Sequence, residues 1–354
     1  MENEFTSWPR LLEAPSYTGA IRTLPEDFQV EEIPAYLPGG EGQHLFLLIE
    51  KISLTTEEVI RELAGQLGVP RHSIGSAGLK DRRALCRQWL SLPAEAERRL
   101  GGFSKEGIKI LDARRHRNKL RTGHLRGNRF RILVRGLDPS CRPEMERRLG
   151  ELARRGFPHY FGPQRFGRNF NNLDQGLAVM NGKLKLRDGR KVRFVLSTVQ
   201  SWLFNRVLAA RLERGWFGRA LVGDLLAFET GRFFLCTEPD KDQPRVDRLE
   251  VHPTGPLFGP DMNQPQGEPE AMERAALESS GLSPEVFERF ARFTWGGRRP
   301  LRAVPKNVSV EQAPEGLWLC FSLPSGAYAT SLLRELIEVQ DAGEQAGDPA
   351  AAET

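Results

Sequence analysis

Residues 75–89 have the sequence GSAGLKDRRALCRQW, which runs from one predicted strand, Ser73–Ala77, into another, Arg87–Leu92. Glycines and small side chains in the connection let the backbone bring Asp81 close to a ligand. The flanking basic residues favour the ionised carboxylate, because an opposite charge within about 4–6 Å stabilises the charged form. Taken alone, these residues leave two interpretations open: an acid placed for chemistry, and a turn aspartate paired with its basic neighbours.

The patterning on both sides of this stretch predicts an α+β fold. Extended character is expected at Ala20–Ile33 and His44–Lys51, and Thr55 with Glu58 forms a capping-box pattern that begins a helix. Further strands are predicted at Gly107–Leu111, Phe130–Val134 and Leu317–Leu323, and further helices at Pro143–Arg155, Val195–Arg214 and Tyr328–Val339. Helices combined with a mixed or antiparallel sheet are typical of the α+β class.

The character of the sequence changes after Gly156. The next residues, GFPHYFGPQRFGRNFNN, are rich in aromatic residues and glycine, and 354 residues favour two domains or one domain with a large insertion. A polar stretch, Asp261–Pro269, predicts a surface loop. The acidic, Ala/Gly-rich end of the chain from Asp341 predicts disorder.

Basic residues are concentrated in Arg114–Arg135, which holds eight arginines, one lysine and no acidic residue. We expect these cations to be unneutralised and to contact phosphates, because like charges repel one another at ordinary salt. A generic basic surface is the alternative. Smaller basic groups occur at Lys183–Arg193 and Arg298–Lys306, and the net charge of +5 is compatible with a nucleic-acid partner.

Several classes of protein are disfavoured. No apolar run approaches the roughly 18–20 residues of a membrane span, and the first ten residues lack the pattern of a secretory signal, so we expect a cytoplasmic protein. Phosphate-binding glycine loops, HExxH and GxSxG are absent, and the four cysteines lack paired spacing. We therefore expect no metal and no cofactor.

Six motifs, in chain order, resemble those of a known family. They are PEDFQVEE (25–32), GEGQH (40–44), AGLKDRRA continuing to QW (77–89), KLR followed by GNRF (119–130), YFGPQRFG (160–167) and FSLPSGAYAT followed by RE (321–335). Together they cover most of the chain. The sequence thus resembles the tRNA pseudouridine synthase D (TruD) family.

The resemblance implies an enzyme that isomerises a uridine of tRNA, at position 13 in the D stem, to pseudouridine. This reaction breaks the N-glycosidic bond, turns the uracil and rejoins it to the ribose through carbon. It needs a carboxylate that acts as nucleophile or base, and no redox agent, metal or activated donor. The resemblance gives this role to Asp81, with both modes of action open, and we expect a monomer whose partner is tRNA.

A uracil stacked in RNA is out of reach of the enzyme, so it has to be extruded at a cost of a few kcal/mol. Aromatic side chains can offset part of this cost by stacking, which is worth about 1–3 kcal/mol per base. Substrate contacts are expected from Phe28, Asn128, Phe130, Tyr328, Lys80, Arg22 and Glu32. RNA-backbone contacts are expected from Arg114, Arg115, Arg117, Lys119, Arg121 and Arg126.

Three residues differ from those of a familiar family member. Arg22 replaces a lysine and changes a point donor to a planar fork, and Tyr328 replaces a phenylalanine and adds a hydroxyl. Cys86 replaces a threonine and removes a good hydrogen-bond donor. These differences concern the positioning of groups in the site and leave the expected reaction class unchanged.

The resemblance also implies a discontinuous architecture. Residues 1–155 and 302–340 would form the pseudouridine synthase catalytic domain, with a mixed or antiparallel sheet. Residues 156–301 would form an inserted α+β TRUD domain, and 341–354 a disordered tail.

Two other functions remain possible on the sequence. One is an RNA-binding or tRNA-remodelling protein with weak or incidental synthase activity. The other is a glycoside-cleaving enzyme, which needs a second placed carboxylate, for which Glu32 is the motif-borne candidate.

Overall fold

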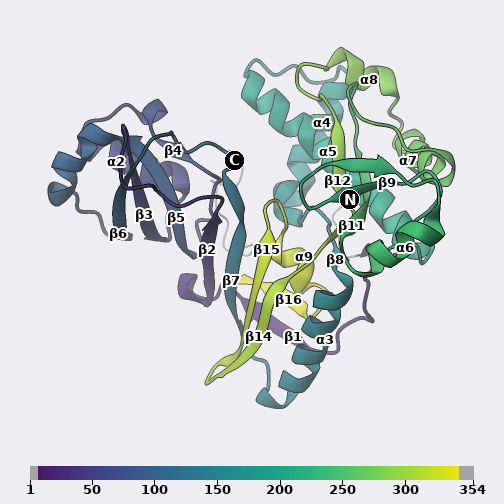
Figure 1. The fold of residues 1–354 in the computed structure, drawn as a ribbon, viewed down its shortest axis with the longest axis horizontal. Helices are drawn as coiled ribbons and strands as arrows, with labels where there is room; N and C mark the ends of the chain where they lie inside the picture. The colour runs from purple at the N-terminus through teal and green to yellow at the C-terminus, as the bar shows by residue number, and fades with distance from the viewer. Residues whose placement is uncertain (1–6, 343–354) are drawn as a thin grey trace.

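A ten-stranded mixed sheet organises the chain (Figure 1), whose computed structural model describes residues 7–342, apart from the side chain of Arg168. The main strand order is β14-β15-β7-β2-β5-β3-β6, with β1 beside β7, β16 beside β1 and β4 beside β5. Its strands are β1 (Thr18–Ile21), β2 (Phe28–Pro34), β3 (His44–Ile52), β4 (Gly75–Ser76), β5 (Leu85–Pro93), β6 (Ile108–His116), β7 (Leu125–Arg135), β14 (Lys306–Ala313), β15 (Gly316–Pro324) and β16 (Glu338–Asp341). The pairs β2–β5 and β1–β16 are parallel and the others are antiparallel, so the sheet is mixed.

Helix α2 (Thr56–Leu67) packs on the part of the sheet formed by β3 and β5. The predicted capping box is present, since the Thr55 side chain accepts from the Glu58 backbone N–H and the Glu58 side chain accepts from the Thr55 N–H. The apolar face of α2 joins a core with Leu45, Leu47 and Ile49 of β3. Burial of this face, more than helix propensity, holds the N-terminal end of α2 in position.

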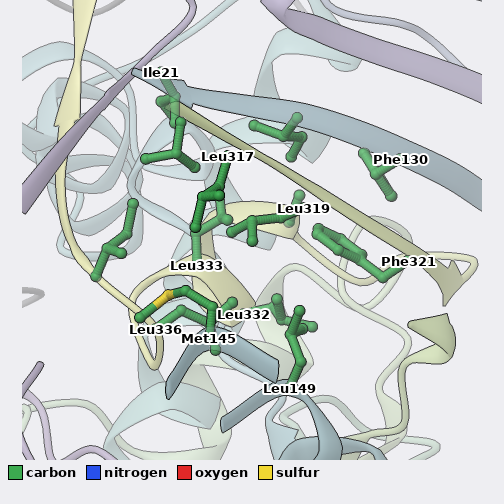
Figure 2. Close-up of a cluster of buried hydrophobic side chains, with 14 of the residues drawn as sticks. Ile21, Phe130, Met145, Leu149, Leu317, Leu319, Phe321, Leu332, Leu333 and Leu336 are labelled. Carbon is green, nitrogen blue, oxygen red and sulfur yellow. The ribbon is translucent and has the colours of Figure 1, made fainter. Parts of the chain in front are cut away.

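The centre of the sheet packs on α3 (Arg142–Arg155) and α9 (Ala329–Leu333). Figure 2 shows this core, in which Met145 and Leu149 of α3 lie close to Leu332 and Leu336, beneath side chains of β15 and β7. Strands β7 and β15 approach very closely at Gly127, where a Cβ atom would lie 2.1 Å from the Leu323 carbonyl oxygen. Glycine is therefore required beside Asn128.

Between α3 and β14 the chain leaves the large sheet and forms the green and teal part on the right of Figure 1. Its helices are α4 (Asn171–Met180), α5 (Gly189–Glu213), α6 (Pro239–Asp247), α7 (Gly267–Glu278) and α8 (Pro284–Arg289). Its strands are β8 (Phe157–Pro158), β9 (Leu225–Phe228), β10 (Phe233–Leu235), β11 (Val251–Leu257), β12 (Gly297–Pro300) and β13 (Arg302–Ala303). Strands β8 and β13 pair where the chain departs and returns, and β10-β9-β11-β12 form a second sheet.

Short 3₁₀ helices complete the described secondary structure. They are Pro25–Asp27, Arg71–Ser73, Ala94–Gly102, Pro139–Cys141, Pro163–Arg165 and Arg168–Phe170. The α+β class and the mixed sheet agree with the sequence prediction. Across residues 7–342, no helix combines the length and the apolar character needed to cross a membrane.

The predicted C-terminal helix Tyr328–Val339 is wrong beyond Leu333. The chain instead turns and forms β16, because a parallel partner, β1, is available from the other end of the chain. Asp341, predicted to begin a disordered tail, lies in β16, and residues 343–354 lie outside the described part.

Three other predicted boundaries differ. Helix α5 begins at Gly189 rather than Val195, because the Asp188 side chain accepts from the Arg190 backbone N–H and caps it. The predicted strand at Ser73–Ala77 is reduced to Gly75–Ser76, and the last residues of the predicted loop Asp261–Pro269 belong to α7.

Candidate active site

Asp81 lies in the loop between β4 and β5, and the start of α2 fixes the backbone just before it. The Lys80 N–H donates to Thr56 Oγ1 over 2.9 Å, and the Thr56 hydroxyl donates to Gln88 Oε1 over 2.8 Å. Lys80, Thr56 and Gln88 are all buried. The loop is therefore joined to both a helix and the strand that follows it.

A buried lysine holds the backbone of Asp81 itself. Lys51 of β3 is 1% exposed, and its Nζ donates to the carbonyl oxygens of Asp81 (2.6 Å) and Leu54 (2.5 Å). The Cys86 thiol also lies 3.7 Å from the Asp81 carbonyl oxygen. Burial lowers the pKa of Lys51 and raises the pKa of Cys86 to about 11, so the cysteine is a neutral thiol that contacts the loop.

The Asp81 carboxylate remains accessible, with 57% of its side chain exposed, and pairs with Arg22. Arg22 Nη2 lies 3.2 Å from Asp81 Oδ2, and Nη1 bonds to Asp341 of β16. The same guanidinium lies 4.0 Å from the centre of the Phe28 ring. The planar guanidinium group of Arg22 thus binds two carboxylates at once. The Arg22 backbone is in the left-handed conformation, with φ of 56°.

Glu32 and Lys80 form a buried ion pair behind the Asp81 loop. Lys80 Nζ lies 3.1 Å from Glu32 Oε2, and the Trp89 N–H donates to Glu32 Oε1 over 3.4 Å. Burial raises the pKa of Glu32, while the charge of Lys80 acts against this shift. Because both its oxygens are engaged, Glu32 is poorly placed to be the second acid of a glycoside-cleaving enzyme.

Asn128 lies opposite Glu32 in the β2–β7 register. Its Oδ1 atom is buried and has no hydrogen-bond partner in the described residues. A buried amide oxygen without a donor is costly, so a ligand that donates a hydrogen bond would be stabilised there.

Phe28 and Phe130 are core side chains at the edge of this region. They are 1% and 7% exposed, their ring centres lie 6.2 Å apart, and Phe130 stacks on Phe321 at 5.5 Å. Figure 2 shows Phe130 beside Phe321 at the margin of the central core. The buried Phe28 ring contacts the Arg22 guanidinium group.

Tyr328 approaches from the C-terminal segment. Burial raises the pKa of Tyr328, the positive charges of Arg165 and Arg299 act against this shift, and the negative charge of Asp81 adds to it. Its ring packs against Phe161 with centres 5.9 Å apart. The charges of Asp81 and of the two arginines thus all affect Tyr328, although their segments are distant in the sequence.

Six of the nine cations of the basic segment pair with carboxylates, contrary to the sequence prediction. Arg114 pairs with Asp112, Arg115 with Glu97 and Arg117 with Glu41. Such exposed pairs are worth about 0–1 kcal/mol, so a phosphate can replace the carboxylate at small cost. Lys119, Arg121 and Arg126 have no carboxylate within 4.0 Å in the described part of the chain.

Several of these residues line a hollow of about 620 Å³ beside β3 and β6. Its lining residues are Tyr36, His44, His116, Arg117, Asn118, Lys119, Arg121 and His124. The Tyr36 ring stacks on His116 at 5.1 Å, and its hydroxyl lies 2.7 Å from His124 Nδ1. Cations beside flat rings at a concave surface suit a polyanion with bases.

Two arginines that the sequence grouped with a basic surface are buried instead. Arg298 pairs with Glu273 at 2.6 Å, and Arg302 Nε donates to His252 Nδ1 over 2.8 Å. Their carboxylate and imidazole partners come from distant segments, so sequence proximity to other arginines was a misleading signal.

Comparisons with known proteins match nearly the whole chain. The family model described as tRNA pseudouridine synthase D (TruD) matches residues 9–186 and 190–336. The chain belongs to the tRNA pseudouridine synthase D family. It is 46% identical over 339 residues to a tRNA pseudouridine synthase D of Thermus thermophilus, covering 95% of this chain and 93% of the relative. It is 44% identical to an Anaeromyxobacter dehalogenans protein of that name, over 91% and 93% of the two chains.

A solved structure agrees with this assignment. The putative tRNA pseudouridine synthase D of Methanosarcina mazei has a TM-score of 0.73 and 25% identity, with 94% of this chain and 96% of that chain covered. The resemblance and the fold class expected from the sequence are therefore confirmed. Membership in the TruD family makes this chain a pseudouridine synthase.

Sequence reasoning missed four residues of this candidate site. Lys51 could have been noticed as a lysine within a largely apolar strand, HLFLLIEKI, and Arg165 lies inside the motif YFGPQRFG. Arg299 was grouped with its basic neighbours, and Asp341 was assigned to a tail. Their roles depend on tertiary contacts that no local pattern encodes.

Proposed function

We propose that this pseudouridine synthase acts on tRNA, at the uridine of position 13 in the D stem, with Asp81 as the catalytic carboxylate. The observation that carries the proposal is the exposed Asp81 carboxylate, held on a braced loop and lying within electrostatic reach of Tyr328. The names of the relatives support tRNA as the substrate.

The reaction is an isomerisation, so the composition of the nucleotide is unchanged: the uracil carbon that bonds to the ribose loses a proton, and the uracil nitrogen released from the ribose gains one. The bond between the ribose carbon and uracil nitrogen breaks, and a bond between the same ribose carbon and a uracil carbon forms. Asp81 either bonds transiently to the sugar or removes a ribose proton and returns one. Both modes need an accessible carboxylate, and the Asp81 side chain is 57% exposed and pairs with Arg22 at 3.2 Å.

The remaining groups would bind the extruded nucleotide. Asn128 Oδ1 is an unfilled acceptor, suited to the uracil N–H or a ribose hydroxyl. Tyr328 would stack on or hydrogen-bond to the base, and Phe28 and Phe130 would form the apolar floor beneath it. Arg22, Lys80 and Glu32 would keep the Asp81 loop and its carboxylate in position.

The RNA would extend over the basic segment and its hollow. Arg114, Arg115, Arg117, Lys119, Arg121 and Arg126 would contact the backbone, with the last three available without breaking an ion pair. In the same proposal, residues 156–301 form an inserted domain within a catalytic domain of 1–155 and 302–340. The enzyme would work in the cytoplasm as a monomer without a cofactor.

Pseudouridine mapping tests the substrate. Chemical labelling and sequencing of tRNA from cells with and without this protein should show loss of pseudouridine at position 13 only in the cells without it. An unchanged position 13, with loss at another RNA site, would contradict the D-stem assignment and retain the reaction class.

A further inference from the structure

Within residues 7–342, two arginines beside Tyr328 have no carboxylate partner. Arg165 ends a 3₁₀ helix and donates from Nη2 to Ser197 Oγ (2.6 Å) and from Nε to Ser201 Oγ (3.3 Å). Arg299 of β12 donates from Nη2 to the carbonyl oxygens of Gly326 (3.0 Å) and His159 (3.3 Å). Within residues 7–342, all these acceptors are neutral, and neither arginine forms an ion pair.

Arg165 and Arg299 are electrostatically unfavourable in the free protein. Burial lowers the pKa of both guanidinium groups, and that of Arg299 falls to about 9, with the charge of Arg165 contributing to the shift. Two other arginines with buried side chains have carboxylate partners: Arg211 pairs with Asp224 at 2.6 Å, and Arg298 pairs with Glu273 at 2.6 Å. Two adjacent uncompensated cations are expensive unless an anion joins them.

Both guanidinium groups also have unused donors. The Nη1 atoms of Arg165 and Arg299 make no hydrogen bond within the described residues, and Arg299 Nε is buried and unpaired. Arg299 lies 4.0 Å from the centre of the Phe161 ring, which holds the guanidinium plane and compensates part of its charge. This contact leaves the edge of the fork available.

We propose that Arg165 and Arg299 bind a phosphate group of the RNA backbone next to the uridine that reacts at Asp81. The inference rests on the proposed function and adds a subsite to it. A phosphate supplies the missing negative charge and accepts from planar guanidinium forks, whereas a neutral uracil does not compensate two cations. Asp81 is not the missing partner, because its carboxylate pairs with Arg22.

The position gives this phosphate a mechanical role. The Phe161 ring packs against Tyr328 on one side and contacts Arg299 at 4.0 Å, so the phosphate would lie on the side of Tyr328 formed by residues 160–165 and β12. Binding a phosphate adjacent to the target would hold the nucleotide out of the RNA stack and offset part of the few kcal/mol that extrusion costs.

The test compares Arg165→Gln and Arg299→Gln with Arg274→Gln, an exposed arginine of α7 that pairs only loosely with Glu270 at 3.8 Å. Binding of a tRNA transcript is measured over a series of salt concentrations, and thermal unfolding is measured for each free protein. Each site variant should bind at least about tenfold more weakly, with a salt slope smaller by about 1, while R274Q matches the unmodified protein. Arg299→Lys, which keeps the charge, should keep the slope.

The thermal stability of the variants distinguishes a role of the two arginines in RNA binding from a role in holding the fold. Removing an uncompensated cation should leave the Tm of the site variants unchanged or higher. Salt slopes equal to that of the unmodified protein, or affinity losses that appear only with a lowered Tm, would overturn the proposal.

A neutral methylphosphonate beside the target uridine identifies the source of the phosphate. This RNA should bind the unmodified protein more weakly than the natural RNA does, and R299Q should not distinguish the two. If inorganic phosphate raises the Tm of the unmodified protein while R299Q still distinguishes the two RNAs, the site takes a free anion and the proposal is wrong.

The binding measurements do not depend on turnover, so they separate this inference from the function on which it rests. Reduced slopes in a protein that forms no pseudouridine would support the phosphate subsite and contradict the proposed function. Pseudouridine formation with unchanged salt slopes would support the proposed function and contradict the phosphate subsite.

Discussion

Asp81 combines an exposed carboxylate with a backbone that the buried side chain of Lys51 holds in place. Lys51 donates to the Asp81 carbonyl oxygen over 2.6 Å, so it holds the backbone of the loop, and its charge also interacts with the Asp81 carboxylate. Positioning of this kind matters because a shift of about 1 Å in a reacting group can lower a rate about 100-fold.

Lys51→Met should therefore lower kcat by about 10- to 100-fold and leave the KM for tRNA nearly unchanged. It should also destabilise the fold by about 1–3 kcal/mol, because two carbonyl oxygens lose their donor. Steady-state kinetics on protein shown to be folded by circular dichroism would measure the first effect, and denaturant unfolding the second. A raised KM with unchanged kcat would show that Lys51 acts on binding instead.

At the scale of elements, the site is assembled where the ends of distant segments meet. The loop after β4 carries Asp81, the start of α2 holds that loop, and the segment before α9 carries Tyr328. Strands β8 and β13 join the region between α3 and β14 to the rest of the chain. Packing at this junction should therefore influence stability without altering the catalytic group.

His252 of β11 provides a pH-dependent test of that junction. Burial, with the charge of Arg302, lowers the pKa of His252 to about 4 from an ordinary value of 6.5. The unfolded chain thus binds a proton between pH 6.5 and 4 that the folded chain excludes, so folded stability falls as pH falls through this window. The loss is at most about 3 kcal/mol.

His252→Gln should lose less stability than the unmodified protein between pH 7 and pH 4. Glutamine keeps an acceptor for Arg302 Nε, which donates to His252 Nδ1 over 2.8 Å. Denaturant unfolding at several pH values would measure the difference. Parallel loss of stability in both proteins would exclude His252 as the titrating group.

Local signals predicted the elements that depend on local chemistry. The Thr55–Glu58 capping box and the apolar stripe of α2 are both present, and Gly156 ends α3 with a backbone φ of 74°. Strand β16 could not be predicted, because its parallel partner β1 lies at the other end of the chain. The sequence identified Asp81 through a motif, whereas Lys51 and Arg299 acquired roles only from their tertiary contacts.

At the scale of the whole molecule, the fold decides which basic side chains acquire a carboxylate partner, and the composition of a segment does not. Arginines that are consecutive in the sequence receive separate carboxylates: Arg114 pairs with Asp112 of the same strand, and Arg115 pairs with Glu97 of a 3₁₀ helix. In the described part of the chain, the cations of the basic segment that have no carboxylate partner lie at the hollow beside β3 and β6 or at the start of β7. The RNA-binding surface should therefore be smaller than the basic segment.

The triple variant Lys119→Gln, Arg121→Gln and Arg126→Gln tests this surface. The slope of log affinity for tRNA against log salt should decrease in magnitude by about 2–3, because each lost phosphate contact contributes about 0.7–0.9. A matched control replaces Arg142, Arg147 and Arg155 of α3, which pair with glutamates on their own helix. Equal slopes for the two triple variants would place the RNA elsewhere.

The central claim is that Asp81 is the catalytic carboxylate of this TruD family member, and one substitution tests it directly. Asp81→Asn keeps the shape of the side chain and removes its charge, with Asp174→Asn on α4 as an exposed control. Pseudouridine formation in a tRNA transcript should be abolished in D81N and unchanged in D174N, while D81N binds tRNA within about tenfold of the unmodified protein. Full activity of D81N would contradict the account.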